Sequence, residues 1–487
     1  MNQDSTPLFD AVNRYIEKHP TYFKIPGHRY EKGINDKWRR AVGDKIFEYD
    51  LTETVMTDDL HNASGAIMES EQLAAELWGS DYAHFLVNGT TCGNEAMILS
   101  TVCEGEKICI PRNAHKSSLY GLILSGAEPV YIMPEVEDEF GLHGGITVSQ
   151  VEAMFAENPD CKGMLIVSPT YYGVTSDIEG IAKVCHRNGA VLMVDEAHGA
   201  HCYLGDDLPK GAIEAGADIC VQSIHKVAGS FTQSSIIHIK SNLIDHNRVK
   251  NNLMMVQSSS PSYLLMTSLD LARHEMAMNG RENINCAYAL SNEARERINK
   301  ISHIACAGTE LIKTAGIDNL DLTRLTISAA ELGITGYELE RILFNEYNID
   351  VELSDYRNVL VIVTYANEKS DLDRLIASLE DISLKRSGGT PLPKGFDFLK
   401  EYKCVMSPRE AYFAPKMTVD WKDAQGHVAG ETITPYPPGI PIIYPGELIT
   451  REVWEYIDHI KETDACLQGM RDKTLNSIEV IATREDV

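Results

Sequence analysis

The sequence predicts an α/β protein in which helices cover both faces of a mainly parallel sheet. Between residues 68 and 240, short apolar segments alternate with segments of helical period, which is typical of strands joined by helical crossovers. A second run of strand, helix, strand and helix at 320–385 predicts a smaller α/β unit towards the C-terminus. With 487 residues, 44% of them apolar, the chain is long enough to bury a large core and to form several domains.

The first half of the chain begins with an expected helix at 8–17 and an irregular arm up to about residue 50. The alternating region follows, with helices expected at 68–78, 95–102 and 178–186. Seven strands are expected there, at 83–87, 107–110, 128–132, 163–167, 191–194, 219–221 and 235–239. Because ligands bind at the carboxyl ends of the strands in such sheets, the residues that follow each strand are the ones to inspect for chemistry.

The second half begins with a long helix, expected at 262–301. The smaller unit follows, with strands at 322–328 and 359–364 and helices at 336–347 and 369–381. A linker at 387–393, a proline-rich loop at 436–441 and a final helix at 450–469 complete the pattern. We therefore expect four parts: an N-terminal arm at 1–60, a large domain at 61–310, a small α/β domain at 311–390 and a C-terminal subdomain at 391–487.

Composition and charge narrow the class of partner. The net charge of −27 argues against nucleic acids and anionic membranes, and it favours a cationic small substrate, although solubility alone explains it equally well. No segment has the pattern of a signal peptide or of a membrane-spanning helix. The eleven cysteines are scattered and never spaced as Cys-x-x-Cys, so we expect reduced thiols in a cytoplasmic protein.

The first two strand ends carry an anion site and an imidazole. Gly89, Thr90 and Thr91 combine small and hydroxyl side chains at the start of a helix, where free N–H groups can point at a phosphate. His115 follows the next strand and could stack on a planar ligand. Taken alone, the segment with Gly89, Thr90 and Thr91 is equally consistent with a simple turn. For His115 taken alone, the favoured interpretation is a histidine that is hydrogen-bonded to a nearby carbonyl or lies at the surface.

The next two strand ends carry a carboxylate and a lysine. Asp195 ends a buried strand, where a carboxylate is costly unless it meets a positive partner such as a protonated pyridine nitrogen. The small Ala197 would let a flat ring approach. Lys226 lies after another apolar strand, where partial burial lowers an ammonium pKa and frees the amine as a nucleophile, and Ser223 and His225 beside it could hold a phosphate. Taken alone, the lysine segment is more simply a strand that runs into a polar turn.

Together these four strand ends predict a site for pyridoxal 5'-phosphate. The cofactor needs a phosphate cradle, a stacking ring, a carboxylate for its ring nitrogen and a lysine for its aldehyde, and the chain supplies all four at one expected sheet edge. Each feature is modest by itself. Their order and shared placement are what favour the cofactor.

The chain resembles the ornithine/lysine/arginine decarboxylases, a pyridoxal-phosphate-dependent family of fold type I. The resemblance covers most of the chain, and the lysine segment at 223–235 is its most specific motif. Further motifs lie at 25–28, 50–53, 58–61, 85–90, 195–199, 258–263 and 436–441. Larger members of the family carry an extra N-terminal domain, whereas this sequence starts almost at the Pro-Gly-His arm, so we expect it to resemble the short, biosynthetic arginine decarboxylases most.

The resemblance implies a role for each site residue. Lys226 forms a Schiff base with the cofactor's aldehyde, Asp195 pairs with the pyridinium nitrogen and His115 stacks on the ring. The cofactor-binding set it implies is Gly89, Thr90, Thr91, His115, Asp195, Ala197, Ser223, His225, Lys226 and Ser258. It further implies a homodimer with each active site at the subunit interface, where the Ser258–Ser260 turn and the N-terminal arm reach into the neighbour's site.

The expected reaction is decarboxylation of a basic amino acid, most simply arginine to agmatine and CO2, with lysine or ornithine as the alternative substrates. Lys226 and His198 are the candidate proton donors to Cα. The distal cation of the substrate needs a carboxylate, for which Glu431 and Glu447 are the first candidates. Asp58 and Asp59 are also candidates, and a solvated surface position is equally consistent with each glutamate.

Three other functions remain open at this point. The same fold and cofactor could serve an aminotransferase or an aldolase. Asp195, His198 and His201 recur at three-residue spacing beside Cys202, so on a helix they could bind zinc, although the phosphate turn and Lys226 would then have no use. A binding protein that has lost turnover is the third possibility, against which the intact set of Lys226, Asp195 and His115 argues.

Overall fold

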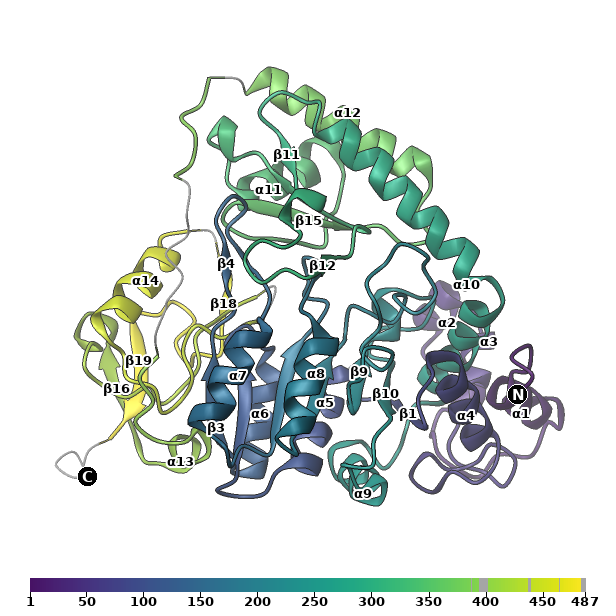
Figure 1. The fold of residues 1–487 in the computed structure, drawn as a ribbon. Helices are drawn as coiled ribbons and strands as arrows, with labels where there is room; N and C mark the ends of the chain where they lie inside the picture. The colour runs from purple at the N-terminus through teal and green to yellow at the C-terminus, as the bar shows by residue number, and fades with distance from the viewer. Residues whose placement is uncertain (387, 394–401, 437–438, 464, 483–487) are drawn as a thin grey trace.

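The computed structural model describes residues 1–386, 388–393, 402–436, 439–463 and 465–482. A seven-stranded sheet forms its centre, in the order β1-β10-β9-β8-β6-β2-β3 (Figure 1). The strands are β1 (Tyr82–Leu86), β2 (Lys107–Pro111), β3 (Glu128–Ile132), β6 (Gly163–Val167), β8 (Val191–Asp195), β9 (Ile219–Gln222) and β10 (Ser235–Ile239). All pairs from β9 to β3 are parallel, and only β10 runs against both of its neighbours. The mainly parallel sheet expected from the sequence is confirmed.

Helices cover both faces of this sheet, as the alternation predicted. Successive side chains of a strand point to opposite faces, so Leu192 and Val194 of β8 pack in one cluster and Val191 and Met193 in another. The first cluster includes α7 (Val148–Glu157) and α8 (Ile178–Arg187), and the second includes α5 (Gly89–Thr101), α6 (Lys116–Ser125) and α9 (His246–Val256). The sheet is therefore the middle layer of three.

The N-terminal part packs beside β1. The helices α1 (Pro7–Glu17) and α4 (Ala66–Trp78) share a core with the start of α10 (Tyr263–Ile298). Between α1 and α4 lie only short elements, which are η1 (Tyr30–Gly33), α2 (Asp36–Val42), α3 (Lys45–Glu48) and η2 (Leu60–Asn62). None of the described helices is long and apolar enough to cross a lipid bilayer, although α10 has 36 residues.

The smaller α/β unit is also present, and α10 runs from the large sheet up to it (Figure 1). Its four antiparallel strands follow the order β11-β13-β15-β14. They are β11 (Ala305–Cys306), β13 (Arg324–Ser328), β15 (Asn358–Ile362) and β14 (Leu353–Ser354), packed against α11 (Gly336–Tyr347) and α12 (Lys369–Lys385). The sequence did not predict the short elements β4 (Val136–Glu137), β5 (Leu142–His143), β7 (Val174–Thr175), η4 (Thr309–Leu311), β12 (Asn319–Leu320) and η5 (Ala330–Leu332). Of these, β7 and β12 pair with each other and so connect the large and small units.

The C-terminal part forms its own core, beside the β3 edge of the sheet (Figure 1). Its elements are α13 (Pro408–Phe413), β16 (Lys416–Asp420), η6 (Trp421–Asp423), β17 (Thr434–Pro435), α14 (Arg451–Lys461), β18 (Leu467–Gln468) and β19 (Ser477–Ile481). The final helix expected at 450–469 is therefore wrong beyond Lys461. Thr463 donates its hydroxyl to the Ile460 carbonyl at 2.6 Å, and the chain then extends to pair with β17.

The four-part division at residues 60, 310 and 390 stays a prediction. Two predicted loops fall partly outside the described residues: Ser387 of the linker, and Pro437 and Pro438 of the proline-rich loop.

Candidate active site

A cavity of about 320 Å³ opens at the carboxyl ends of β1, β2, β6, β8 and β9. Most of the site residues expected from the sequence line this one cavity, although they come from segments more than a hundred residues apart. They are Gly89, Thr90, Thr91, His115, Asp195, Ala197, His198, Ser223, His225 and Lys226. The sheet edge thus assembles the four predicted features as the parallel topology requires.

The turn between β1 and α5 forms one wall of the cavity. Gly89 has φ +74°, a conformation that glycine adopts readily, and the N-cap residue Asn88 makes no side-chain cap. The first N–H groups of α5 are therefore free of the usual capping oxygen. The Thr90 hydroxyl lies 2.6 Å from that of Ser223 and 3.1 Å from that of Ser235. This wall can bind an anion through N–H and O–H groups.

Asp195 lies at the bottom of the cavity and is 3% exposed. Its Oδ2 accepts a hydrogen bond from Asn94 Nδ2 at 2.7 Å, and its Oδ1 accepts one from the Ala197 N–H at 3.2 Å. Asn94 also donates to the Ser117 hydroxyl at 2.9 Å, which fixes the amide. In the part of the chain that the structure describes, both partners of this carboxylate are neutral. It can therefore accept a cationic N–H from a bound group.

Lys226 ends the short helix η3 (Ile224–Lys226), in the connection that reverses the chain between β9 and β10. Its Nζ lies 2.8 Å from His198 Nε2 and 4.6 Å from the centre of the Tyr171 ring. Burial lowers the pKa of Lys226 to about 8, although the nearby carboxylates of Asp195 and Glu352 act in the opposite direction. An appreciable fraction of the amine is thus neutral near pH 7, as a nucleophile requires.

Two of the four histidines that line the cavity, His198 and His115, are held in their neutral forms. Burial holds the pKa of His198 well below its ordinary value, and the charge of Lys226 acts in the same direction. Burial also lowers the pKa of His115 to about 4. His115 Nδ1 accepts the Ser117 N–H at 3.2 Å as the N-cap of α6, so the neutral ring carries its proton on Nε2. Its ring is therefore fixed in direction at the cavity wall.

Other expected residues do not lie at this cavity. Ser258 is exposed, and its N–H donates to Asn88 Oδ1 at 3.1 Å. Glu431 accepts the N–H groups of Arg471 at 2.9 Å and Glu479 at 3.0 Å. Asp58 and Asp59 accept backbone N–H groups near the start of α4 and in η2. These contacts occupy the three acidic side chains in local structure.

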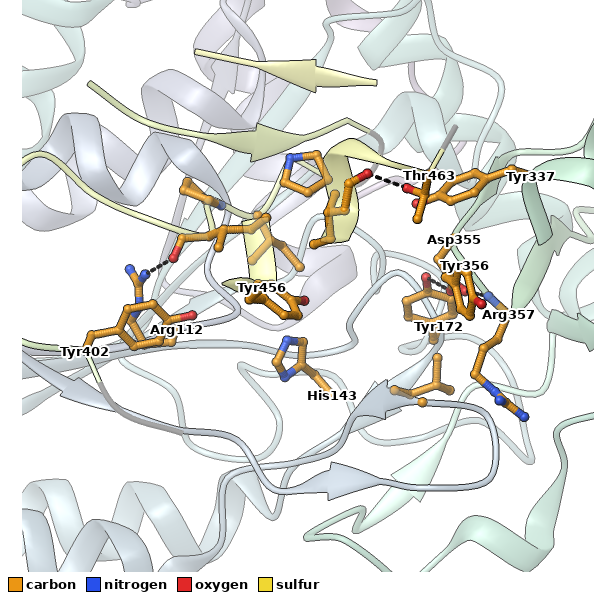
Figure 2. A pocket seen from close by; sticks show the side chains of 17 residues that line it. Arg112, His143, Tyr172, Tyr337, Asp355, Tyr356, Arg357, Tyr402, Tyr456 and Thr463 are labelled. Atoms are coloured by element: carbon orange, nitrogen blue, oxygen red, sulfur yellow. Dashed lines mark hydrogen bonds between the residues drawn. The ribbon is translucent and has the colours of Figure 1, made fainter. Parts of the chain in front are cut away.

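Glu447 pairs with Arg112, which lines a second cavity at the junction of the large, small and C-terminal parts (Figure 2). There Arg112 lies between the rings of Tyr402 and Tyr444, at 3.8 Å from each ring centre. Arg112 Nη2 is 3.3 Å from Glu447 Oε2, and both side chains are almost fully buried. This second cavity, of about 150 Å³, shares His143, Tyr172 and Ile440 with the first one. The carboxylate of Glu447 is thus engaged by a permanent cation.

Three residues near the site escaped the sequence analysis. Asn94 lies one turn into α5, and Tyr171 follows the end of β6, so the rule that strand ends carry the chemistry could have found Tyr171. Glu352 precedes β14 in the small unit, and its charge acts on the pKa of both Lys226 and Tyr171. Glu352 does not line the cavity, and no sequence pattern marks it, because its charge comes near Lys226 only through the packing of the two units.

The zinc arrangement is not formed. Residues after Asp195 make turns instead of a helix, so the shared helical face does not exist. His198 Nε2 faces Lys226, and His201 Nε2 lies 2.9 Å from Asp321 Oδ2. Among the described residues, no group of three His, Cys, Asp or Glu side chains is placed to hold a metal ion.

Comparison with known proteins places these features in one family. Residues 6–371 match the major domain of the Orn/Lys/Arg decarboxylases, and residues 396–476 match the C-terminal domain of the same family. The arginine decarboxylase of Bacillus subtilis (strain 168) is 39% identical over 491 residues, which cover 100% of both chains. That of Halalkalibacterium halodurans is 39% identical over 100% of this chain and 99% of its own.

The fold agrees with a solved structure as well. The lysine decarboxylase of Francisella novicida has a TM-score of 0.83 and 20% identity, over 98% of this chain and 81% of that one. At that identity the likeness concerns the fold alone, whereas the sequence matches extend over both domains. The chain belongs to the Orn/Lys/Arg decarboxylase family.

Proposed function

We propose that this protein binds pyridoxal 5'-phosphate and converts arginine to agmatine and CO2. The observation that carries the proposal is the single cavity in which Lys226 and the buried Asp195 face an uncapped helix N-terminus. Four curated relatives at 37–39% identity are named arginine decarboxylase, which favours arginine over lysine and ornithine. A decarboxylase is also favoured over an aminotransferase or an aldolase by membership of the family.

The residues present fit the cofactor. The start of α5 with Thr90, Thr91 and Ser223 would hold its phosphate, together with His225. Asp195 would accept the ring N–H, because the other partners of this buried carboxylate are neutral. Lys226 would hold the aldehyde carbon, and His115 and Ala197 would flank the ring. When bound, the cofactor supplies an electron sink for the electron pair that remains on Cα after CO2 leaves.

The chain's own residues would then bind the substrate and move one proton. Burial of Lys226, His198 and Tyr171 keeps the place of reaction apart from bulk water, which favours loss of a carboxylate as neutral CO2. Cα afterwards needs a proton. We infer that Lys226 Nζ delivers it, since His198 Nε2 lies 2.8 Å away and can exchange protons with the amine.

Glu352 is our candidate for the distal cation of the substrate. It is an acidic side chain of the small unit whose field reaches Lys226, and burial raises its pKa while Lys226 and Arg324 oppose that rise. Glu431 and Glu447 stay a weaker prediction, because local hydrogen bonds or Arg112 already engage them. A guanidinium could bind the Glu352 carboxylate through two N–H groups.

The working form that we propose is a cytoplasmic homodimer. Large apolar side chains are exposed on the N-terminal arm and beside the lysine segment, including Phe23, Ile25, Val55 and Phe231. Such a surface is typical of an interface. Ser258 is exposed and does not line its own cavity, so we infer that it contacts the cofactor in the neighbour's site. All cysteines of the described chain are free thiols, which suits a reducing compartment.

The test is the Lys226→Ala variant. We expect the wild-type protein to be yellow, to bleach with borohydride and to carry the reduced label on Lys226. It should release one CO2 per agmatine from arginine, without any keto acid, and act far less on lysine and ornithine. Lys226→Ala should lose both label and turnover, whereas Lys210→Ala, an exposed lysine paired with Glu179, should keep them. Full turnover in Lys226→Ala would contradict the proposal.

A further inference from the structure

A buried ion network lies behind the cavity, where the small unit meets the turn after β8. Its members from the small unit are Asp321, Thr323 and Arg324, just before and at the start of β13, and none of them lines the candidate active site. Asp321 is 0% exposed and Arg324 2%. A charged group that is this deeply buried is costly unless it is paired, so the contacts of Asp321 and Arg324 are needed to stabilise their charges.

Asp321 is the centre of the network. Its Oδ2 lies 2.9 Å from His201 Nε2 and 3.6 Å from Arg324 Nε, and its Oδ1 accepts the hydroxyl of Thr323 at 2.7 Å. Burial by itself would raise the pKa of Asp321, but His201 and Arg324 outweigh burial, so this pKa lies below its ordinary value. Asp321 therefore stays ionised and holds both His201 and Arg324.

The network reaches Lys226 through the backbone of His198. Arg324 Nη2 donates to the His198 carbonyl at 3.2 Å, and the His198 ring places Nε2 2.8 Å from Lys226 Nζ. Two contacts from the small unit, one to His198 and one to His201, thus hold the turn that follows Asp195. On the opposite side, Trp78 Nε1 donates to the Ala200 carbonyl at 2.8 Å.

We propose that Asp321 and Arg324 are positioning residues for Lys226, which hold the 195–201 turn from the small unit so that His198 faces the amine. The inference rests on the proposed function, in which Lys226 is the reacting amine. It adds to that function a set of contacts through which the small unit sets the surroundings of Lys226 without contacting the substrate.

The direction in which the pKa of Lys226 should change when the Arg324 guanidinium is removed can be predicted. The groups that act on Lys226 are Asp195 and Glu352, which raise its pKa, and Arg324, which lowers it together with burial; His198 and Tyr171 contact the amine in their neutral forms. Without Arg324 one positive charge is lost, and a looser turn admits water. Both changes favour the ammonium form, so the pKa of Lys226 should rise.

The experiment measures the free amine directly. The full-length chain, cleared of bound aldehydes with hydroxylamine, is labelled with an amine-reactive reagent at a series of pH values, and the modification rate of Lys226 is followed by peptide mass spectrometry. The wild-type rate should rise with a midpoint near pH 8. In Arg324→Gln the midpoint should move up by about one pH unit, so that labelling at pH 7 slows about tenfold.

A matched pair provides the control. Asp270 and Arg273 have the same sequence spacing as Asp321 and Arg324, and both are fully buried with an N–O distance of 2.9 Å. Within the described chain their hydrogen bonds join each other and the segment up to the start of α1, and none goes to the 195–201 turn. Arg273→Gln should leave the midpoint unchanged. An unshifted midpoint in Arg324→Gln, or an equal shift in Arg273→Gln, overturns the proposal.

If Arg324→Gln does not fold, a second variant tests the same proposal. Arg324→Lys keeps the charge but cannot contact both Asp321 and the His198 carbonyl, so its midpoint should rise by less than that of Arg324→Gln. A wild-type midpoint in Arg324→Lys overturns the proposal. Labelling needs no turnover, so an absence of arginine decarboxylation would sink the proposed function and leave this result standing.

Discussion

Two buried cations show how the surroundings of a residue decide its role. Lys226 can lose its proton, and burial lowers its pKa to about 8, which makes it reactive. Arg112 cannot lose its proton in a protein, so its burial requires a permanent counter-charge. Glu447 provides that charge at 3.3 Å. A glutamate beside the proline-rich loop is thus part of the structure.

The Glu447→Gln variant tests this structural role. We expect it to lower the free energy of unfolding by about 3 kcal/mol, because Arg112 would remain buried without a counter-charge. Urea unfolding measures the change, and the KM for arginine of the folded fraction should not move. Glu455→Gln, on the exposed side of α14, should change stability by less than about 0.5 kcal/mol. Wild-type stability in Glu447→Gln would show that the pair is dispensable.

Glu352 has the opposite character, because no salt bridge engages its carboxylate within the described part of the chain and its charge acts on Lys226. If it binds the guanidinium of the substrate, Glu352→Gln should raise the KM for arginine roughly tenfold or more while kcat changes little. Steady-state kinetics with arginine and with lysine measure the effect. Glu331→Gln, an exposed glutamate of the same unit, is the control. An unchanged KM would remove Glu352 from the substrate site.

Among the secondary-structure elements, those that place the chemistry were predictable from sequence. The strands at 128–132, 163–167 and 235–239 have the predicted bounds, because each is a short apolar run between helical segments. The start of α5 was placed six residues late, since the glycine and hydroxyl residues that make it an anion site hide its helical period. Two-residue strands such as β7 carry no period at all, so only tertiary pairing defines them.

The residues of the candidate active site could also be predicted only where a local sequence pattern marks them. Lys226, Asp195 and His115 could be found because each follows a strand of the sheet. The contacts of Glu431 could not be foreseen, because its direction depends on backbone N–H groups that lie 40 and 48 residues further along the chain. Arg324 gave no signal because its contact is with a carbonyl oxygen, which every residue possesses.

The close contact of α5 with β9 yields a prediction at the element scale. A Cβ on Gly93 would lie 2.4 Å from Val221 Cγ2 and 2.9 Å from Leu86 Cδ1, so Gly93→Ala must push the helix away from the sheet. We expect a loss of about 1–3 kcal/mol in stability, as for other overpacked cores, and weaker cofactor binding because the N-terminus of α5 moves. Thermal unfolding and cofactor titration measure both. Ile457→Ala, a truncation in the core of the C-terminal part, is the control, because it should lower stability without weakening cofactor binding. An unchanged cofactor affinity in Gly93→Ala would mean that the N-terminus of α5 does not bind the phosphate.

In the whole molecule, three units surround two connected cavities, and α10 joins the large sheet to the small one (Figure 1). Apolar side chains of the N-terminal arm are exposed to solvent at one side of the large unit. The exposed fraction of Phe23 is 81%, and Val55 is fully exposed. The Ser258–Ser260 turn lies on the surface as well. In the homodimer that we propose, a second copy of the chain would cover these surfaces and complete each cavity.

Complementation between two inactive variants tests this arrangement. Lys226→Ala lacks the reacting amine but keeps the Ser258–Ser260 turn, whereas a variant with Ser258, Ser259 and Ser260 all changed to Asp keeps the amine and repels phosphate in the neighbour's cavity. If each cavity uses the turn of the other subunit, a hybrid dimer has one cavity with a lysine and an intact turn. Co-expression with two affinity tags should therefore give arginine decarboxylation that neither variant shows alone. Lys226→Ala co-expressed with Lys226→Arg should stay inactive, because no cavity then has its amine. Hybrid dimers that form and remain inactive would mean that each subunit completes its own site.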